Sequence, residues 1–285
     1  MRRTLVLIAL VFVAISSFAQ EKKMLTPNDA AYQNRSLYPT GKNIQWMPNT
    51  DKYIFADETN PSSLMIQGVN AKSAEVLLSL DQVNTYLNKA ELENVKRIPN
   101  LTWINTEKAY YYNFDQSSNM VSLYMLDLKA ESITKITSIP ANAENHTIST
   151  PSMKVAYTIG NNLYYADGNK QIQVTDNPEN VVAGKAVHRN EFGIDGGIFW
   201  SPDGSKLAYY SMDERMVTDY PLVDITERVA TAKPIKYPMA GMTSHVVTLK
   251  IHNIKNGKEI VVKTGEPADQ YLTSITWNPD NKKVY

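Results

Sequence analysis

Short runs in which apolar and polar residues alternate, each ended by a polar turn, recur along most of the chain. Between residues 247 and 252 every second side chain is apolar. This period of two is typical of a half-buried β-strand. Asn256-Gly257 then predicts a hairpin turn into residues 260–262, and Asp167-Gly168 predicts a similar turn between residues 163–165 and 171–174. The pattern therefore predicts a chain built mainly from short antiparallel strands.

A longer repeat organises these strands. Five segments consist of an aromatic or apolar residue, a polar turn and a β-rich run, and they begin at Trp46, Trp103, Ile148, Trp200 and Trp277. Most begin about 45 to 57 residues apart, and four short strands at that period are typical of a β-propeller blade. We expect an all-β fold, a partial β-propeller of about four to five blades, in which each anchoring aromatic packs between neighbouring sheets. A β-sandwich whose turns resemble one another by chance is the alternative.

One segment departs from the β pattern. Leu80, Val83 and Leu87 share one helical face, and Ser79 precedes them as a candidate N-cap. A short helical insert on one blade is therefore predicted.

The spacing before the last repeat is longer than one blade. The extra residues lie between Met212 and Ser244 and contain Pro221, Pro234 and Pro238, which predicts an excursion from the sheet rather than a linker. The sequence then stops at Tyr285, one strand into a further blade, which would leave a sheet edge unpaired. We therefore expect residues 20–285 to be part of a propeller truncated at its C-terminal end.

The N-terminal residues have the features of an export signal. Arg2 and Arg3 precede an apolar run over residues 5–15, which is too short to span a bilayer, and Ser17 and Ala19 supply small residues for cleavage. We expect residues 1–19 to be a signal peptide, cleaved near Gln20, and the protein to be periplasmic or extracellular. A retained membrane anchor is the alternative.

Composition excludes several function classes. The chain of 285 residues is 43% hydrophobic and 20% charged, with a formal net charge of zero and no cysteine. Scattered Lys and Arg argue against a nucleic-acid partner, and the lack of thiols excludes thiolate zinc sites. The sequence contains no Gly-x-Ser-x-Gly, Gly-x-Gly-x-x-Gly or P-loop motif. No catalytic residue, cofactor or metal is therefore expected in this chain.

The histidines and one acidic pair have simple interpretations from sequence. The four histidines lack metal-ligand spacing, and we expect surface or loop positions for all of them: His146, His188, His245 and His252. His245 and His252 are expected on opposite faces of one strand. Asp213 and Glu214 are expected in a solvated loop.

Residues 187–197 do not fit a strand or a linker, and they carry a resemblance. The chain resembles the N-terminal propeller of the dipeptidyl peptidase IV family, within the prolyl oligopeptidase superfamily, and is most similar to bacterial prolyl tripeptidyl peptidases. The matching segments follow in order: Glu191-Phe192-Gly193, Trp200-Ser201-Pro202, Met212-Asp213 and Tyr237-Pro238-Met239-Ala240-Gly241. In those relatives a short helical insert bears the glutamate.

The resemblance implies a role for the insert. Glu191 would bind the free α-ammonium of a peptide substrate from a partly dry cavity, with Arg189, Asn190 and Phe192 as supporting residues. A charge-assisted hydrogen bond of this kind would measure substrates from their N-terminus. An acid that merely lies on a surface helix is the alternative for Glu191.

The departures from the family pattern also matter. Dipeptidyl members have consecutive glutamates, whereas Asn190 precedes Glu191 here, which favours tripeptide over dipeptide release without deciding it. No convincing match exists for the arginine that many members place on the substrate carbonyl. The family's Ser-Asp-His triad belongs to a C-terminal α/β-hydrolase domain that these residues lack, so this chain alone is expected to be inactive.

The implied whole protein is an exported, prolyl-specific serine exopeptidase, with the propeller gating access. A homodimer through the 212–244 arm is implied as well. A non-enzymatic, exported propeller that binds other molecules is the alternative.

Overall fold

The computed structural model describes residues 24, 26–32, 43–57 and 59–285, so the predicted signal peptide lies outside the described residues. The chain divides into two compact units, Met1–Asn43 and Ile44–Tyr285. In the first unit the described residues include α2 (Pro27–Ala31), which begins after the N-cap Thr26. Thr26 and Asp29 form a reciprocal capping box.

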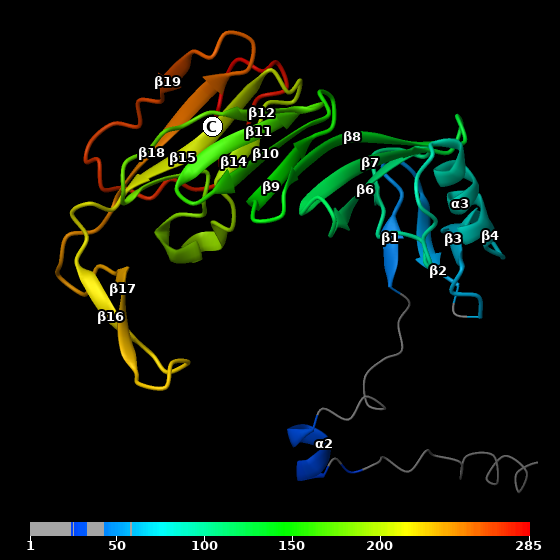
Figure 1. Cartoon of the computed structure of the whole chain (residues 1–285), viewed down its shortest axis with the longest axis horizontal. Coiled ribbons are helices and arrows are strands. Elements are labelled where there is room, and N and C mark those ends of the chain that lie inside the picture. Colours follow the sequence, from blue (N-terminus) through cyan, green and yellow to red (C-terminus); the bar gives the residue numbers. More distant parts are fainter. Residues whose placement is uncertain (1–23, 25, 33–42, 58) are drawn as a thin grey trace, which may run out of the picture. The chain divides into compact units, whose positions relative to one another are not determined.

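The second unit is built from antiparallel sheets that follow one another along the chain (Figure 1). The first sheet contains, in order, β1 (Ile44–Trp46), β2 (Lys52–Ala56), β3 (Ser63–Gly68) and β4 (Glu75–Ser79). The second contains β5 (Thr102–Trp103), β6 (Lys108–Asp115), β7 (Met120–Asp127) and β8 (Ser132–Pro140). The third contains β9 (Glu144–Ser149), β10 (Lys154–Ile159), β11 (Asn162–Asp167) and β12 (Lys170–Gln173).

The fourth sheet has five strands, and the segment over residues 187–197 lies between two of them. Its central path is β13 (Val181–Ala183), β15 (Lys206–Asp213), β18 (Val246–Asn253) and β19 (Glu259–Val261), while β14 (Ile198–Trp200) also pairs with β15. A separate hairpin of β16 (Asp219–Asp224) and β17 (Thr231–Lys236) leaves between β15 and β18. This hairpin, drawn in yellow in Figure 1, is the predicted excursion over residues 212–244.

Consecutive sheets bury apolar side chains against one another, as blades of a propeller do. One cluster joins Leu123 and Ile139 of the second sheet to Val155 and Tyr157 of the third. Another cluster joins the third sheet to the fourth. The predicted propeller blades are therefore confirmed, and the alternative of a sandwich is wrong.

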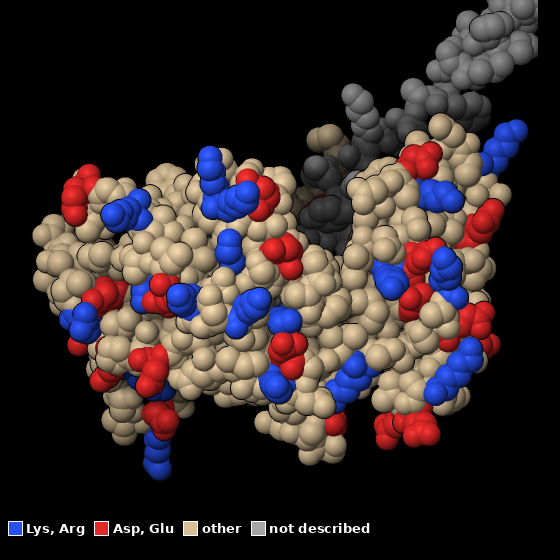
Figure 2. Space-filling view, turned by 90° about the horizontal axis from the view of Figure 1, so that it is seen from above, with Lys and Arg blue, Asp and Glu red and all other residues tan. Residues whose placement is uncertain are grey.

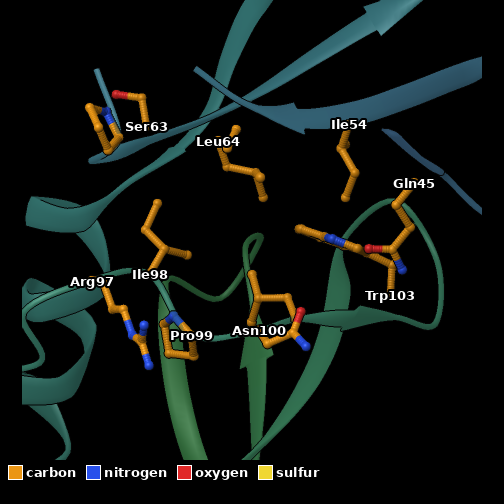
Figure 3. Close-up of a pocket in the computed structure, with 12 residues that line it drawn as sticks. Gln45, Ile54, Ser63, Leu64, Arg97, Ile98, Pro99, Asn100 and Trp103 are labelled. Atoms are coloured by element: carbon orange, nitrogen blue, oxygen red, sulfur yellow. The ribbon is translucent and has the colours of Figure 1, made fainter. Parts of the chain in front are cut away.

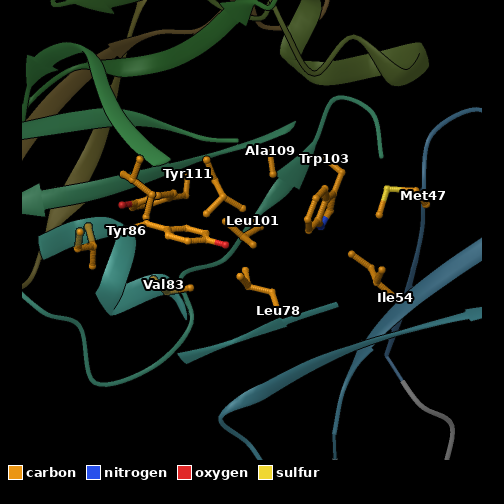
Figure 4. Packing of buried hydrophobic residues seen from close by; sticks show 12 residues of the cluster. Met47, Ile54, Leu78, Val83, Tyr86, Leu101, Trp103, Ala109 and Tyr111 are labelled. Atoms are coloured by element: carbon orange, nitrogen blue, oxygen red, sulfur yellow. The ribbon is translucent and has the colours of Figure 1, made fainter. Parts of the chain in front are cut away.

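The predicted helix is confirmed as α3 (Leu80–Lys89). Ser79 is its N-cap and forms a reciprocal capping box with Gln82. Val83 and Leu87 are buried, and both join the cluster between the first two sheets, part of which Figure 4 shows.

The Pro-Asp-Gly turn before β15 forms as its residue types predict. The Asp203 carboxylate accepts hydrogen bonds from the Ser205 N–H (3.0 Å) and the Ser201 hydroxyl (2.7 Å). The Ser205 backbone bond is the main cause that lowers the pKa of Asp203. Gly204 takes a φ of +68°, which a side chain would strain.

The anchoring tryptophans connect one sheet to the next by hydrogen bonds. Trp200 Nε1 donates to the Thr147 carbonyl (3.1 Å), and Trp277 Nε1 donates to the Phe199 carbonyl (2.9 Å). In both cases the acceptor immediately precedes the anchor of the sheet before. By the same register, Trp103 would donate to the carbonyl of Gln45.

Trp103 breaks this rule. Its side chain is 4% exposed, and its Nε1 has no hydrogen-bond partner among the described residues. Trp103 and Gln45 instead line a cavity of about 410 Å³ between the first two sheets, which Figure 3 shows with Ile54, Leu64 and Ile98 around it. The contact between the first two sheets therefore lacks a hydrogen bond that two later contacts have.

Charges on the surface are intermingled. On the face seen in Figure 2, Lys and Arg side chains alternate with Asp and Glu and do not gather into a patch of one sign. This agrees with the net charge of zero.

Candidate functional site

The candidate site is the loop between β13 and β14, and its base is closed by the backbone of one buried tyrosine. The Gly184 N–H donates to the Tyr210 carbonyl (2.8 Å), and the Tyr210 N–H donates to the Gly197 carbonyl (3.0 Å). A Cβ at Gly197 would lie 2.1 Å from the Lys185 carbonyl oxygen. The chain therefore leaves and re-enters the sheet at one point, and the close approach there requires glycine at position 197.

The tip of this loop is the 3-10 segment η2 (His188–Gly193), and it is not a regular helix. His188, Arg189, Asn190 and Phe192 all have φ between +50° and +60°, whereas Glu191 is extended (φ −66°, ψ 155°). The expectation of a helical segment carrying Glu191 is therefore wrong in detail. The left-handed region is unfavourable for residues with a Cβ, so contacts around the segment must hold its backbone in this conformation.

Glu191 is fixed by a residue far away in sequence. The Tyr271 hydroxyl donates to Glu191 Oε2 at 2.9 Å, and the Phe192 ring lies edge-on to the Tyr271 ring with centroids 5.3 Å apart. Among the described residues, no protein donor bonds the other carboxylate oxygen, Oε1. The Oε1 atom of Glu191 is therefore free to accept a hydrogen bond, while the bond from Tyr271 to Oε2 holds the carboxylate in position.

The expected dry cavity around Glu191 is not present in the described residues. Glu191 is exposed, and Phe192 beside it is 78% exposed. The reason is that the loop closes at its base, through Gly184 and Gly197, while its tip projects from the sheet. Any burial of the Glu191 carboxylate must come from a bound molecule or another part of the protein.

Two histidines lie next to Tyr271, outside the strands as one form of the prediction has it, but both are buried. His188 and His245 are 7% and 9% exposed, and His188 Nδ1 lies 3.2 Å from His245 Nε2. The Leu272 N–H donates to His188 Nε2 (3.4 Å), and the His188 and Tyr271 rings lie 4.3 Å apart. His245 precedes β18 rather than sharing that strand with His252, which is buried as well.

The two other predicted supporting residues form no hydrogen bond to the Glu191 carboxylate among the described residues. Arg189 Nη2 donates to the Lys236 carbonyl (3.0 Å), and its guanidinium lies 3.8 Å from the centroid of the Tyr237 ring. The exposed Asn190 donates its backbone N–H to the Val187 carbonyl (3.1 Å). Arg189 therefore ties the loop to the base of the β16–β17 hairpin.

A small cavity of about 150 Å³ lies on the other side of the histidine pair, lined by Arg189, Glu214 and Lys236 among others. Glu214 is half-buried and not in a solvated loop as expected. Burial raises the pKa of Glu214, and the cations of Arg189 and Lys236 oppose that shift. Asp213 is the last residue of β15 and not a loop residue as expected, and it pairs with the exposed Arg215.

Sequence reasoning found Glu191 and Phe192 but missed Tyr271 and His245. Neither missed residue lies in a motif, and each reaches the site over a long sequence separation, so a single sequence carries no signal for them. No cluster of three His, Asp or Glu side chains suited to a metal occurs in the part of the chain that the structure describes. Of the helices in that part, none is both long and apolar enough to cross a membrane.

Comparison with known proteins places these features in a family. A family model for the dipeptidyl peptidase IV (DPP IV) N-terminal region matches residues 99–285. A probable dipeptidyl peptidase 4 of Aspergillus flavus is 24% identical over 277 residues, covering 90% of this chain and 34% of its own length. The chain thus spans about a third of the length of the curated relatives it matches.

Solved structures show the same fold. A putative dipeptidyl aminopeptidase IV from Bacteroides ovatus is 37% identical, with a TM-score of 0.70, covering 85% of this chain and 32% of its own. Porphyromonas gingivalis dipeptidyl peptidase 4 has a TM-score of 0.64 at 19% identity, covering 92% of this chain and 38% of its own.

Proposed function

Because this chain belongs to the dipeptidyl peptidase IV N-terminal family, we propose that it is the substrate-gating propeller of an exported, prolyl-specific serine exopeptidase. In the whole protein, a serine of an α/β-hydrolase domain attacks the carbonyl after proline and releases a short N-terminal peptide. The chain described here supplies the group that recognises the free N-terminus of the peptide.

The observation that carries the proposal is the position of Glu191. The Tyr271 hydroxyl holds one carboxylate oxygen at 2.9 Å, and η2 holds the backbone in an unusual conformation. Strained backbone of this kind is found disproportionately at functional sites. An α-ammonium has three N–H donors and a positive charge, so the free oxygen of Glu191 can accept a charge-assisted hydrogen bond from it.

Recognition of the N-terminus sets the length of the released peptide. A substrate whose amine is acetylated cannot supply the cation, and the carboxylate then loses its water without gaining a partner. Asn190 stands where dipeptidyl relatives have a second acid. A single carboxylate leaves room for a third residue, which favours tripeptide release.

The β16–β17 hairpin supports a second proposal, a homodimer in which this arm contacts a second copy. The hairpin exposes apolar side chains, among them Leu222, Val223, Ile225 and Val229. A two-stranded hairpin is marginally stable alone, and exposed apolar groups of this kind mark interaction surfaces.

One experiment tests the main proposal. The whole protein is assayed on matched proline-containing tripeptides, one with a free N-terminus and one acetylated, and on the corresponding dipeptides. Strong preference for the free tripeptide supports the proposal. Equal turnover of free and acetylated substrates contradicts it, and a complete lack of peptidase activity favours the propeller as a binding module.

A further inference from the structure

We infer that Tyr271 and the His188–His245 pair are positioning residues for Glu191, and that recognition of a free N-terminus requires both histidines to be uncharged. Acid then switches the site off. This inference rests on the proposed role of Glu191, but the state of the histidine pair can be tested separately.

Hydrogen-bond accounting fixes the protonation state of the pair. The Leu272 N–H donates to His188 Nε2, so this nitrogen must carry a lone pair. A neutral imidazole has one N–H, which then lies on His188 Nδ1 and donates to His245 Nε2. The hydrogen bond from the Leu272 N–H and the one between the two rings can both form only when both rings are neutral.

An added proton breaks this arrangement wherever it binds. On His188 it creates an Nε2–H that faces the Leu272 N–H. On His245 it creates an Nε2–H that faces His188, whose own proton must then move to Nε2, again against the Leu272 N–H. In either case two buried donors oppose one another, and the hydrogen bond from Leu272 is lost.

The pair is connected to Glu191 through the segment that Leu272 anchors. The Leu272 carbonyl accepts a hydrogen bond from the buried Tyr210 hydroxyl (2.7 Å), and its N–H bonds His188. The preceding residue, Tyr271, lies against the His188 ring and donates to Glu191. Loss of the Leu272–His188 bond therefore releases one of two anchors beside the tyrosine that holds the carboxylate.

The charged groups around the histidine pair do not cancel the effect of burial on the two pKa values. Burial is the main cause that lowers the pKa of both histidines. For His188 the partner His245 adds to that shift and Glu191 opposes it, while for His245 the Arg189 cation adds to it. Glu214 and Lys236, of opposite charge, line the cavity next to the pair.

The direction of the pH effect follows. The pKa values of His188 and His245 are both lowered from 6.5 in the folded protein. The stability that the neutral pair contributes is therefore fully present above pH about 6.5. It is lost as the pH falls through the lowered folded values. The α-amine of the substrate, with a pKa of about 7.7–8.0, stays charged throughout that range, so it cannot cause a loss of binding in acid.

The first arm of the test needs no peptidase activity. Nitrogen-15 histidine NMR spectra of the 285-residue chain are recorded between pH 8 and pH 4.5. We expect His188 as the Nδ1–H tautomer at pH 7.5 and His188 and His245 titrating below pH 6.5. Protonation of either histidine at pH 7.5, or an Nε2–H tautomer of His188, would overturn the inference.

The second arm measures selectivity in the whole protein. The ratio of kcat/KM for free and acetylated tripeptides is followed over the same pH range, because the ratio cancels titration of the catalytic groups. We expect the wild-type ratio to fall in acid together with the NMR titration. Tyr271→Phe keeps the ring on His188 but removes the hydroxyl, and should lower the ratio roughly two- to ten-fold at pH 7.5, the worth of one hydrogen bond.

The control is Tyr53→Phe, at a tyrosine of the first sheet with no hydroxyl hydrogen bond to the described residues. A wild-type ratio for Tyr271→Phe, or an equal loss in both variants, would overturn the positioning role. If Glu191→Gln leaves the ratio unchanged, the proposed function fails instead, and the NMR arm still decides the state of the pair.

Discussion

Glu191→Gln is the substitution that tests the recognition of the substrate ammonium most directly. Glutamine has the same shape, and its amide oxygen can still accept the hydrogen bond from Tyr271. The change therefore removes the negative charge and leaves the loop in place. Because the ion pair forms before the chemistry and persists through it, the loss should fall on kcat/KM.

The expected magnitude depends on how much water reaches the carboxylate. Glu191 is exposed in this chain, and exposed ion pairs contribute about 0.2–1 kcal/mol, which is at most a five-fold effect. A charge-assisted bond shielded from water contributes about 1.5–3 kcal/mol. We expect a loss of roughly ten- to a hundred-fold, because in the proposed whole protein a substrate held between the propeller and a hydrolase domain would be shielded from solvent.

The assay compares free and acetylated tripeptides ending in proline, at low and high salt. Glu191→Gln should slow the free peptide and leave the acetylated one nearly unchanged. Glu75→Gln, which removes an exposed charge from the first sheet, is the matched control and should change neither. A loss of five-fold or less that disappears at high salt would mean an open site. An equal loss for both substrates would refute a role in ammonium recognition.

Three further predictions concern stability and assembly. Trp200→Phe should lower the free energy of unfolding by about 0.5–1.5 kcal/mol more than Trp103→Phe does, because only Trp200 loses a hydrogen bond. Equal losses for the two variants in urea unfolding would contradict the difference between the two sheet contacts. Gly197→Ala should lower the free energy of unfolding by about 1–3 kcal/mol or more. Gly196→Ala, whose Cβ would meet nothing within 4 Å, should leave the free energy of unfolding unchanged in the same measurement. Ile225→Asp should dissociate the proposed dimer in analytical ultracentrifugation, and an unchanged sedimentation coefficient of a dimer would exclude the arm.

Much of the fold could be predicted from sequence because its determinants are local. The alternation at residues 247–252 defines a strand, and the turn after Trp200 is specified by side chains within five residues. Ser79 and Gln82 likewise cap α3 without help from elsewhere. The repeat then orders these elements, since Trp46, Trp103 and Ile148 each lie in the first strand of a sheet.

The candidate site was only half predictable because its determinants are distant. Glu191 stood out by its motif, but its hydrogen-bond donor lies 80 residues later in a segment without a pattern. The histidines were predicted at surface or loop positions, and nothing local shows that His188 and His245 face each other across 57 residues. Burial of such a pair is a property of the tertiary structure alone.

Tyr210 explains why these distant parts meet at one place. Its backbone closes the base of the loop through Gly184 and Gly197, while its hydroxyl holds the carbonyl of Leu272. Tyr210 itself is 1% exposed and lies within β15, whose neighbours on the sheet fix its position. One core residue thus fixes both the point where the Glu191 loop leaves the sheet and the position of the segment that carries Tyr271. The propeller repeat, although it supplies no reactive group, therefore determines where the Glu191 carboxylate lies.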